Sequence, residues 1–241
     1  MPKSIKEFYG SKLAGLDGDI GHVKDFYFDD KTWVIRYVVV DTGSWLSKRL
    51  VLLSPHSIGR LEEVAKTVLV NLTRKQIEDS PSIDSHIPVS RQHEIKYYHY
   101  YGLPAYWHGN WRWGMRSYPV LLPSAKEETA GEPQYQHRDS NHLRSTRAVA
   151  GYSVETSDGK IGRLGGFRVD GDSWAITEVI VEVGELLATR EVPISPDKIE
   201  GISAQEEKVL VNLNLAEIRR SAEAQIARVH PENLGAKNVR G

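Results

Sequence analysis

The pentapeptide Val-Leu-Val-Asn-Leu stands at residues 68–72 and recurs letter for letter at residues 209–213. The same offset aligns Asp17-Gly18-x-Ile20-Gly21 with Asp158-Gly159-x-Ile161-Gly162. Between positions 17 and 77, 23 of 61 aligned pairs are identical, and the alignment needs no gap. A constant offset that persists through every loop indicates two copies of one structural unit, each with its own core.

Composition limits the classes of function that remain. With 31 basic and 32 acidic residues the net charge is −1, so no global electrostatic argument favours a nucleic-acid or membrane-surface partner. The chain has no cysteine, which excludes disulfides, thiolate metal sites and a cysteine nucleophile. The N-terminus lacks an apolar core of signal-peptide length, and no stretch approaches the ~18 apolar residues of a membrane span. We expect a soluble cytoplasmic protein without membrane insertion.

Each copy has the pattern of a small β-barrel or rolled sheet, because short apolar runs alternate with turn residues. A helix start follows each copy, where Thr73 precedes Gln76 and Asn214 precedes Glu217 at capping-box spacing. The second helix is expected to continue from Leu215 and to pack across the partner copy. In the first copy the expected strands are 20–28, 33–40, 49–53 and 68–72, and each has a counterpart at the same offset in the second copy.

These motifs resemble the PRC-barrel family, which is named for the cytoplasmic part of the photosynthetic reaction-centre H subunit and also occurs in ribosome-maturation factors. In addition to the Asp-Gly-x-Ile-Gly motifs, the resemblance rests on the Trp33–Val40 strand with Gly43 and Arg49-x-Val51, and on Trp174–Val181 with Arg190-x-Val192-Pro193. The first copy departs from the pattern at Leu52, where the second has the more typical proline. The signature residues are Gly18, Gly21, Trp33, Arg49, Gly159, Gly162, Trp174 and Arg190.

The resemblance implies a barrel that docks onto other proteins and carries no chemistry of its own. We therefore predict a mainly β protein with two tandem small PRC-type β-barrels, each followed by a helix and joined by an aromatic-rich connector. The predicted boundaries are 1–80 for the first repeat, 81–145 for the connector, 146–230 for the second repeat with its C-terminal helix, and 231–241 for a flexible tail.

The connector is unusually rich in aromatic residues, nine of which lie between residues 97 and 118. One interpretation is a buried clasp that fills the gap between the barrels. A second is an exposed surface for a protein partner or for self-association. A third is a stacking site for single-stranded nucleic acid, which the few nearby basic residues do not favour. The candidate binding residues are Tyr97, Tyr101, Tyr106, Trp107, Trp111 and Trp113.

Signatures of catalysis are missing from the sequence. It has no Gly-x-Ser-x-Gly elbow, no phosphate-binding Gly-x-x-x-x-Gly-Lys loop and no Gly-x-Gly-x-x-Gly fingerprint. The histidines lack the helical spacing of a zinc site. We therefore expect no enzymatic activity, no catalytic residue, no metal and no cofactor.

Three functions remain open at this point. The first is a non-enzymatic interaction or scaffold protein that forms homodimers. The second, which rests on the resemblance alone, is an accessory factor of the photosynthetic apparatus or of RNA processing and ribosomes. The third is a small-molecule binder or hydrolase with a pocket between the barrels under the aromatic segment, in which Arg49, Arg190 or a histidine would supply polar contacts.

Overall fold

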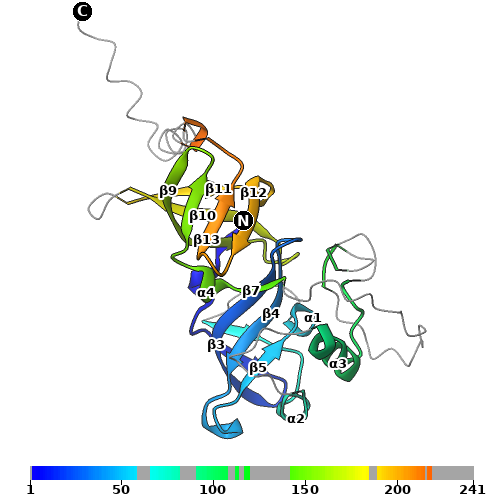
Figure 1. Ribbon diagram of the computed structural model, residues 1–241. Coiled ribbons are helices and arrows are strands. Elements are labelled where there is room, and N and C mark those ends of the chain that lie inside the picture. Colours follow the sequence, from blue (N-terminus) through cyan, green and yellow to red (C-terminus); the bar gives the residue numbers. More distant parts are fainter. Residues whose placement is uncertain are drawn as a thin grey trace, which may run out of the picture. The chain divides into compact units, whose positions relative to one another are not determined.

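The structure is a computed structural model that describes residues 2–58, 66–81, 91–107, 112–113, 117–119, 142–184, 189–214 and 216–218. The chain divides into two compact units. Unit 1 holds residues 1–148 and 168–177, and unit 2 holds residues 149–167 and 178–241. Strands arranged in two curled sheets dominate the described residues (Figure 1), which confirms the predicted mainly β fold class.

The first sheet has the strand order β5-β4-β3-β2-β6, and β7 pairs with the free end of β3. Its strands are β2 (Lys12–Gly15), β3 (Gly18–Asp29), β4 (Val34–Asp41), β5 (Leu50–Leu53), β6 (Thr67–Leu69) and β7 (Leu143–Ser145). The short helices of this part are η1 (Ile5–Phe8), η2 (Gly43–Leu46), α1 (Pro55–Ile58), α2 (Arg74–Glu78), α3 (Arg91–Tyr101) and α4 (Thr146–Val149).

The second sheet has the strand order β11-β10-β9-β8-β13-β12, and the N-terminal strand β1 pairs with the end of β9. Its strands are β1 (Lys3–Ser4), β8 (Ser153–Thr156), β9 (Gly159–Val169), β10 (Ile176–Val183), β11 (Arg190–Ile194), β12 (Ile199–Ser203) and β13 (Lys208–Val211), with η3 (Pro196–Lys198) before β12.

The elements of the two copies correspond at the offset found in the sequence. Strands β2, β3, β4, β5 and β6 have their counterparts in β8, β9, β10, β11 and β13. Even an irregularity recurs, because the register shifts between Leu13 and Ala14 in β2 and between Val154 and Glu155 in β8. The two predicted capping boxes also form, around Thr73 and around Asn214.

One glycine of each signature motif is required by a close approach of two strands. A Cβ atom at Gly21 would lie 2.0 Å from the carbonyl oxygen of Asp41, and one at Gly162 would lie 2.1 Å from that of Glu182. The φ angle of Gly21 is 153°, a conformation that other residues rarely adopt. No other residue fits between these strands without displacing the backbone.

The core of unit 1 lies on strand β4, whose residues 34–40 are all buried. The β-branched run in each copy is typical of a strand with much of both faces covered. Strand β4 has this burial, whereas its counterpart β10 is buried only in part. In β3 a bulge between Val23 and Asp25 shifts the alternation by one residue, so that Val23 and Phe26 are both buried.

Two tryptophans with left-handed backbones stabilise the hairpin tips that belong to unit 1. Trp33 has a φ angle of 55° and Trp174 one of 58°, and each donates its N–H to the carbonyl of an aspartate four residues earlier. Their own carbonyls accept hydrogen bonds reciprocally: Ile176 donates to Trp33 at 2.7 Å, and Ile35 donates to Trp174 at 2.9 Å. These bonds hold an otherwise strained backbone in place.

Several predictions fall on parts of the chain outside the described residues. These are the continuation of the second helix beyond Ile218, the tail at 231–241 and most of the connector between 114 and 141. The four domain boundaries predicted from the sequence stay predictions.

Candidate functional site

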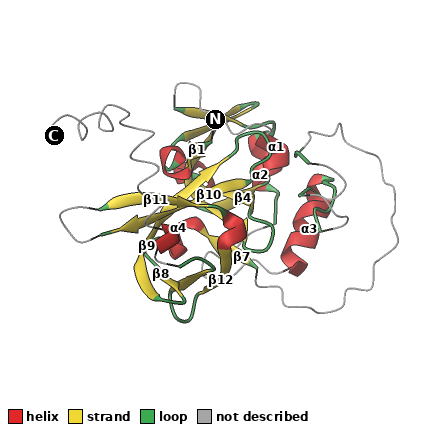
Figure 2. Cartoon of the chain, turned by 90° about the horizontal axis from the view of Figure 1, so that it is seen from above, coloured by secondary structure: helices red, strands yellow, loops and turns green. Residues whose placement is uncertain are grey.

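Helix α3 places tyrosine rings against strand β4 and the end of β5, and Figures 1 and 2 show it beside α1. Tyr97 and Tyr98 are only 1% and 3% exposed. The ring of Tyr37 meets both edge-on, at centroid distances of 5.4 and 6.4 Å. The backbone N–H of Ser54 donates to the Tyr97 hydroxyl at 2.9 Å. This part of the connector is therefore core of unit 1.

A buried carboxylate joins the connector to β4. Tyr37 and Tyr106 both donate their hydroxyls to Oε1 of Glu94, the former at 3.0 Å. Arg91 Nη1 lies 2.8 Å from Glu94 Oε2. Burial raises the pKa of the Glu94 carboxyl above its usual range, although Arg91 and the two phenols act in the opposite direction. The ion pair and the two hydrogen bonds offset part of the cost of burying this charge, and Oε2 accepts no hydrogen bond.

Arg36 anchors the following part of the connector. Its guanidinium lies 3.8 Å from the ring centroid of Tyr106 and 5.0 Å from that of Trp113. It also donates to the carbonyl of Arg112 and, at 2.9 Å, to Thr32 Oγ1. Cation–π and hydrogen-bond contacts of this kind hold the segment through both its rings and its backbone.

The predicted binding residues divide into buried, partly exposed and undescribed ones. Tyr97, Tyr106 and Trp113 are buried, at 1%, 4% and 2% exposure, so they lie in the interior of unit 1 and not on its surface. Tyr101 and Trp107 are partly exposed. Burial raises the pKa of Tyr101 to about 12. Trp111 lies outside the described residues.

The buried rings belong to the core of unit 1. A role of the connector between two barrels, and a partner for the partly exposed rings, stay predictions.

The surface that receives the connector is specific to the first copy. Three of its side chains, Arg36, Tyr37 and His56, are nearly fully buried, and the His56 ring meets Trp113 edge-on at 4.9 Å. The corresponding side chains of the second copy are smaller or acidic: they are Thr177, Glu178 and Asp197, in that order. The sequence difference between the copies thus has a physical reason.

The two signature arginines occupy different environments. Arg49 donates to the carbonyls of Glu78 and Ser80 and so closes the C-terminal end of α2. Arg190 starts strand β11 opposite Val183 and is exposed. Gly18 and Gly159, the first residues of β3 and β9, have φ angles of 142° and 125°, where glycine is favoured. The signature is therefore mainly structural.

Exposed leucines form a feature that the sequence reasoning missed. Leu69 in β6 is 63% exposed and Leu210 in β13 is 42% exposed, and the two occupy the same position of the repeat. Leu16, in the turn after β2, is 66% exposed. The signal was present in the repeated pentapeptide, because a strand that buries its two valines must direct the leucine between them outward.

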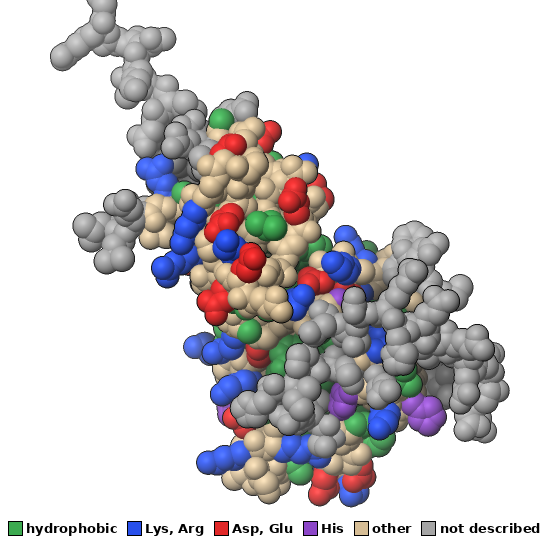
Figure 3. Space-filling view, viewed as in Figure 1, with side chains coloured by type: hydrophobic (Ala, Val, Ile, Leu, Met, Phe, Trp, Pro, Cys, Tyr) green, Lys and Arg blue, Asp and Glu red, His purple; other side chains and the backbone are tan. Residues whose placement is uncertain are grey.

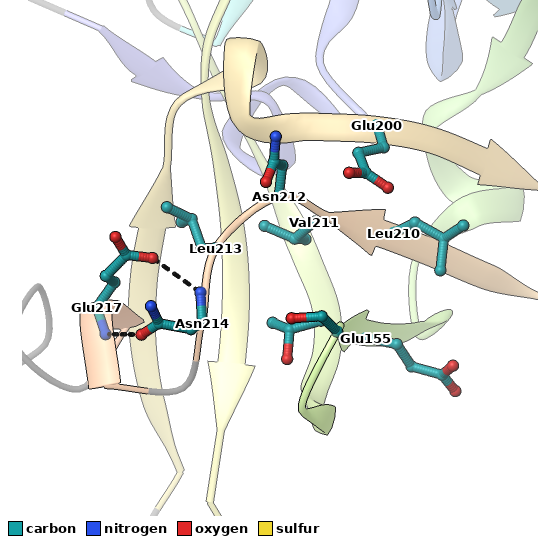
Figure 4. Close-up of a pocket in the computed structure, with 10 residues that line it drawn as sticks. Glu155, Glu200, Leu210, Val211, Asn212, Leu213, Asn214 and Glu217 are labelled. Carbon is teal, nitrogen blue, oxygen red and sulfur yellow. Dashed lines mark hydrogen bonds between the residues drawn. The ribbon is translucent and has the colours of Figure 1, made fainter.

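A cavity of about 400 Å³ in unit 2 has Leu210 among its lining residues (Figure 4). Strand β13 supplies the apolar floor, and the capping pair of Asn214 and Glu217 closes one end. Its lining is made of Glu155, Thr156, Ser157, Glu200, Leu210, Val211, Asn212, Leu213, Asn214 and Glu217.

Metal-binding clusters and membrane-spanning helices are not found in the described part of the chain. There, no group of three or more histidines, aspartates or glutamates has the arrangement of a metal site. None of the helices described is both long and apolar enough to cross a membrane. Acidic and basic side chains are interspersed over the described part of the face in Figure 3, in keeping with the balanced composition.

These observations define a mainly β protein with an internal repeat of one sheet module. The family comparison identifies the first copy: residues 4–77 match the model of the PRC-barrel domain, so this chain carries a PRC-barrel domain. The resemblance stated from the signature motifs is thereby confirmed for the first copy.

A relative from Deinococcus radiodurans, an uncharacterized protein, is 37% identical over 71 residues. The aligned part is 29% of this chain and 25% of that protein, so the chain spans about a quarter of the length of its relative.

Proposed function

We propose that the protein is a non-enzymatic interaction or scaffold protein in which two PRC-barrel modules dock a protein partner or a second copy of the chain. The inference that the second copy is also a PRC-barrel module rests on the constant offset between the copies in sequence, strand order and backbone irregularities. A homodimer is the simplest assembly for such a chain.

The observation that carries the proposal is the outward leucine shared by the two copies. Its neighbours in the pentapeptide, Val68 and Val209 among them, are buried at 2% and 1% exposure, so packing accounts for their identity. Packing does not account for an exposed leucine at Leu69 and again at Leu210. An exposed apolar side chain at the same position of both copies supports an interaction surface at this position of the repeat.

Neighbouring surface positions diverge between the copies. Lys12 and Asp19, which pair at 2.8 Å in the first copy, correspond to serine and lysine in the second. The retained leucine therefore differs from its surroundings, and the first copy adds Leu16 two residues after Ala14, the β2 partner of Leu69.

The test compares the wild-type protein with a Leu69→Ser/Leu210→Ser double variant. Since both side chains are exposed, each change should alter the free energy of unfolding by no more than about 0.5 kcal/mol. Light scattering over a concentration series, together with affinity enrichment from the native cell, should show an assembly for the wild type that the variant loses. A monomeric wild type without reproducible partners, or a variant with unchanged assembly, would contradict the proposal. Thr67→Ser, on the same strand, is the control.

A further inference from the structure

One neighbour of Leu210 in the sheet is a glycine. Leu210 pairs with Gly201 of β12 on one side and with Glu155 of β8 on the other. Residues directly opposite each other in neighbouring strands present their side chains on the same face of the sheet. A Cβ atom at Gly201 would meet no other atom within 4 Å. The missing side chain thus leaves one flank of Leu210 uncovered.

Acidic side chains surround this apolar floor. Glu155, Glu200 and Glu217 all line the cavity. Glu155 lies 3.3 Å from Lys208, and Glu217 accepts the N–H of Asn214 at 2.8 Å. Within the part of the chain that the structure describes, Glu200 has no ion pair. The lining of the groove therefore combines an exposed leucine with three glutamates and no basic side chain, and Figure 4 labels these four residues.

We propose that this groove docks a protein segment in which an apolar side chain lies next to a lysine or arginine. The apolar side chain would cover Leu210, and the cation would lie beside Glu155 and Glu200. Charge complementarity favours a basic segment over an acidic one. It adds specificity to a contact that buries the apolar surface of Leu210. This inference rests on the proposed function and assigns a partner chemistry to one of its surfaces.

The same location in the first copy has a different chemistry. Glu155, Ser157 and Glu217 correspond to Ala14, Leu16 and Gln76. The carboxylates of the second copy are thus replaced by apolar or neutral side chains around the equivalent leucine. The two copies would therefore bind different segments at equivalent positions, around Leu69 and around Leu210.

The experiment is a titration of the full-length, ¹⁵N-labelled protein with the peptide acetyl-Ala-Lys-Leu-Lys-Ala-amide, followed by amide chemical shifts. We expect shifts centred on Gly201, Leu210 and Asn212. Peptides with glutamate in place of both lysines, or alanine in place of leucine, should bind at least about threefold more weakly. Raising the salt concentration should weaken only the lysine peptides.

Two variants make the result specific. Glu155→Gln/Glu200→Gln should weaken the lysine peptide at least about threefold and leave the glutamate peptide no weaker than before. Gly201→Leu should weaken the lysine peptide by placing a side chain beside Leu210, and a dispersed spectrum shows that it folds. The proposal is overturned if millimolar lysine peptide causes no shifts at the groove, or if lysine and glutamate peptides bind alike.

Other occupants would also appear in this titration. Groove shifts that depend on protein concentration without peptide would assign the site to a second copy. A tighter peptide affinity after truncation beyond Ile218 would assign it to residues 219–241. Either result overturns the proposed partner chemistry, whereas the Leu69→Ser/Leu210→Ser assembly test would still decide the proposed function independently.

Discussion

Replacement of the paired glycines by alanine tests the close strand contact in both copies. In Gly21→Ala the new Cβ would lie 2.0 Å from the Asp41 carbonyl oxygen, so the strands must move apart by more than an ångström to reach an ordinary contact. We expect a loss of ~3 kcal/mol from this displacement, at the upper end of overpacking. The positive φ of Gly21 adds ~1 kcal/mol of strain. Gly162→Ala, with its contact at 2.1 Å, should lose ~3 kcal/mol without the strain.

The chain supplies a matched control for each variant. Gly10 has a φ of 79° and open space around its Cβ position, so Gly10→Ala should lose only the ~1 kcal/mol of strain. Gly201 has open space and no positive φ, so Gly201→Ala should be neutral or stabilising by about 0.5 kcal/mol. Urea unfolding followed by tryptophan fluorescence and circular dichroism measures all four. The reasoning fails if Gly21→Ala and Gly162→Ala lose no more stability than their controls.

Three further predictions concern the buried polar contacts of unit 1. Tyr106→Phe keeps the ring over Arg36 but removes a hydroxyl that donates to the Glu94 carboxylate. Urea unfolding should therefore show a free energy of unfolding lower by ~1.5–3 kcal/mol, and a decrease below ~0.5 kcal/mol would refute the contact. Burial raises the pKa of Glu94 in the folded state, so the stabilisation by the protonated carboxyl is present below the usual pKa of 4.5 and is lost as pH rises through the raised pKa. The free energy of unfolding of the wild type relative to Glu94→Gln should therefore decline with rising pH. A difference that does not change with pH would refute the burial argument. Burial lowers the pKa of His142, whose Nε2 must be unprotonated to accept a hydrogen bond from Arg91 at 3.0 Å. The wild type should therefore lose stability relative to His142→Gln as pH falls below 6.5. Unfolding free energies of the two proteins that change in parallel with pH would count against this hydrogen bond.

The repeat made the fold accessible from the sequence. Turn residues, β-branched runs and capping boxes all have local causes, and each occurs twice, so chance matches are reduced. The strand at 33–40 was predicted to be covered on both faces, and it is buried from Val34 to Val40. The limits of the fourth strand were less accurate, because β6 ends at Leu69 where 68–72 was expected. Beyond that point Asn71 donates its N–H to Ser57, outside the ladder.

The candidate site was less accessible from the sequence. The aromatic residues of the connector were identified, but composition does not show which rings are buried. Burial of Tyr106 and Trp113 depends on Arg36, whose place under both rings follows from tertiary contacts far apart in the sequence. The groove at Leu210 is lined by residues of β8, β12 and β13, so it becomes evident only once these strands are paired.

Residue-resolved amide hydrogen exchange tests the duplicated module most directly. Protection reports how strongly each strand is held in the fold. The account predicts that slowly exchanging amides in β3 and β4 recur at the equivalent positions of β9 and β10, with faster exchange at the same turns. Protection in one copy, combined with exchange at unfolded rates in the other, would contradict it.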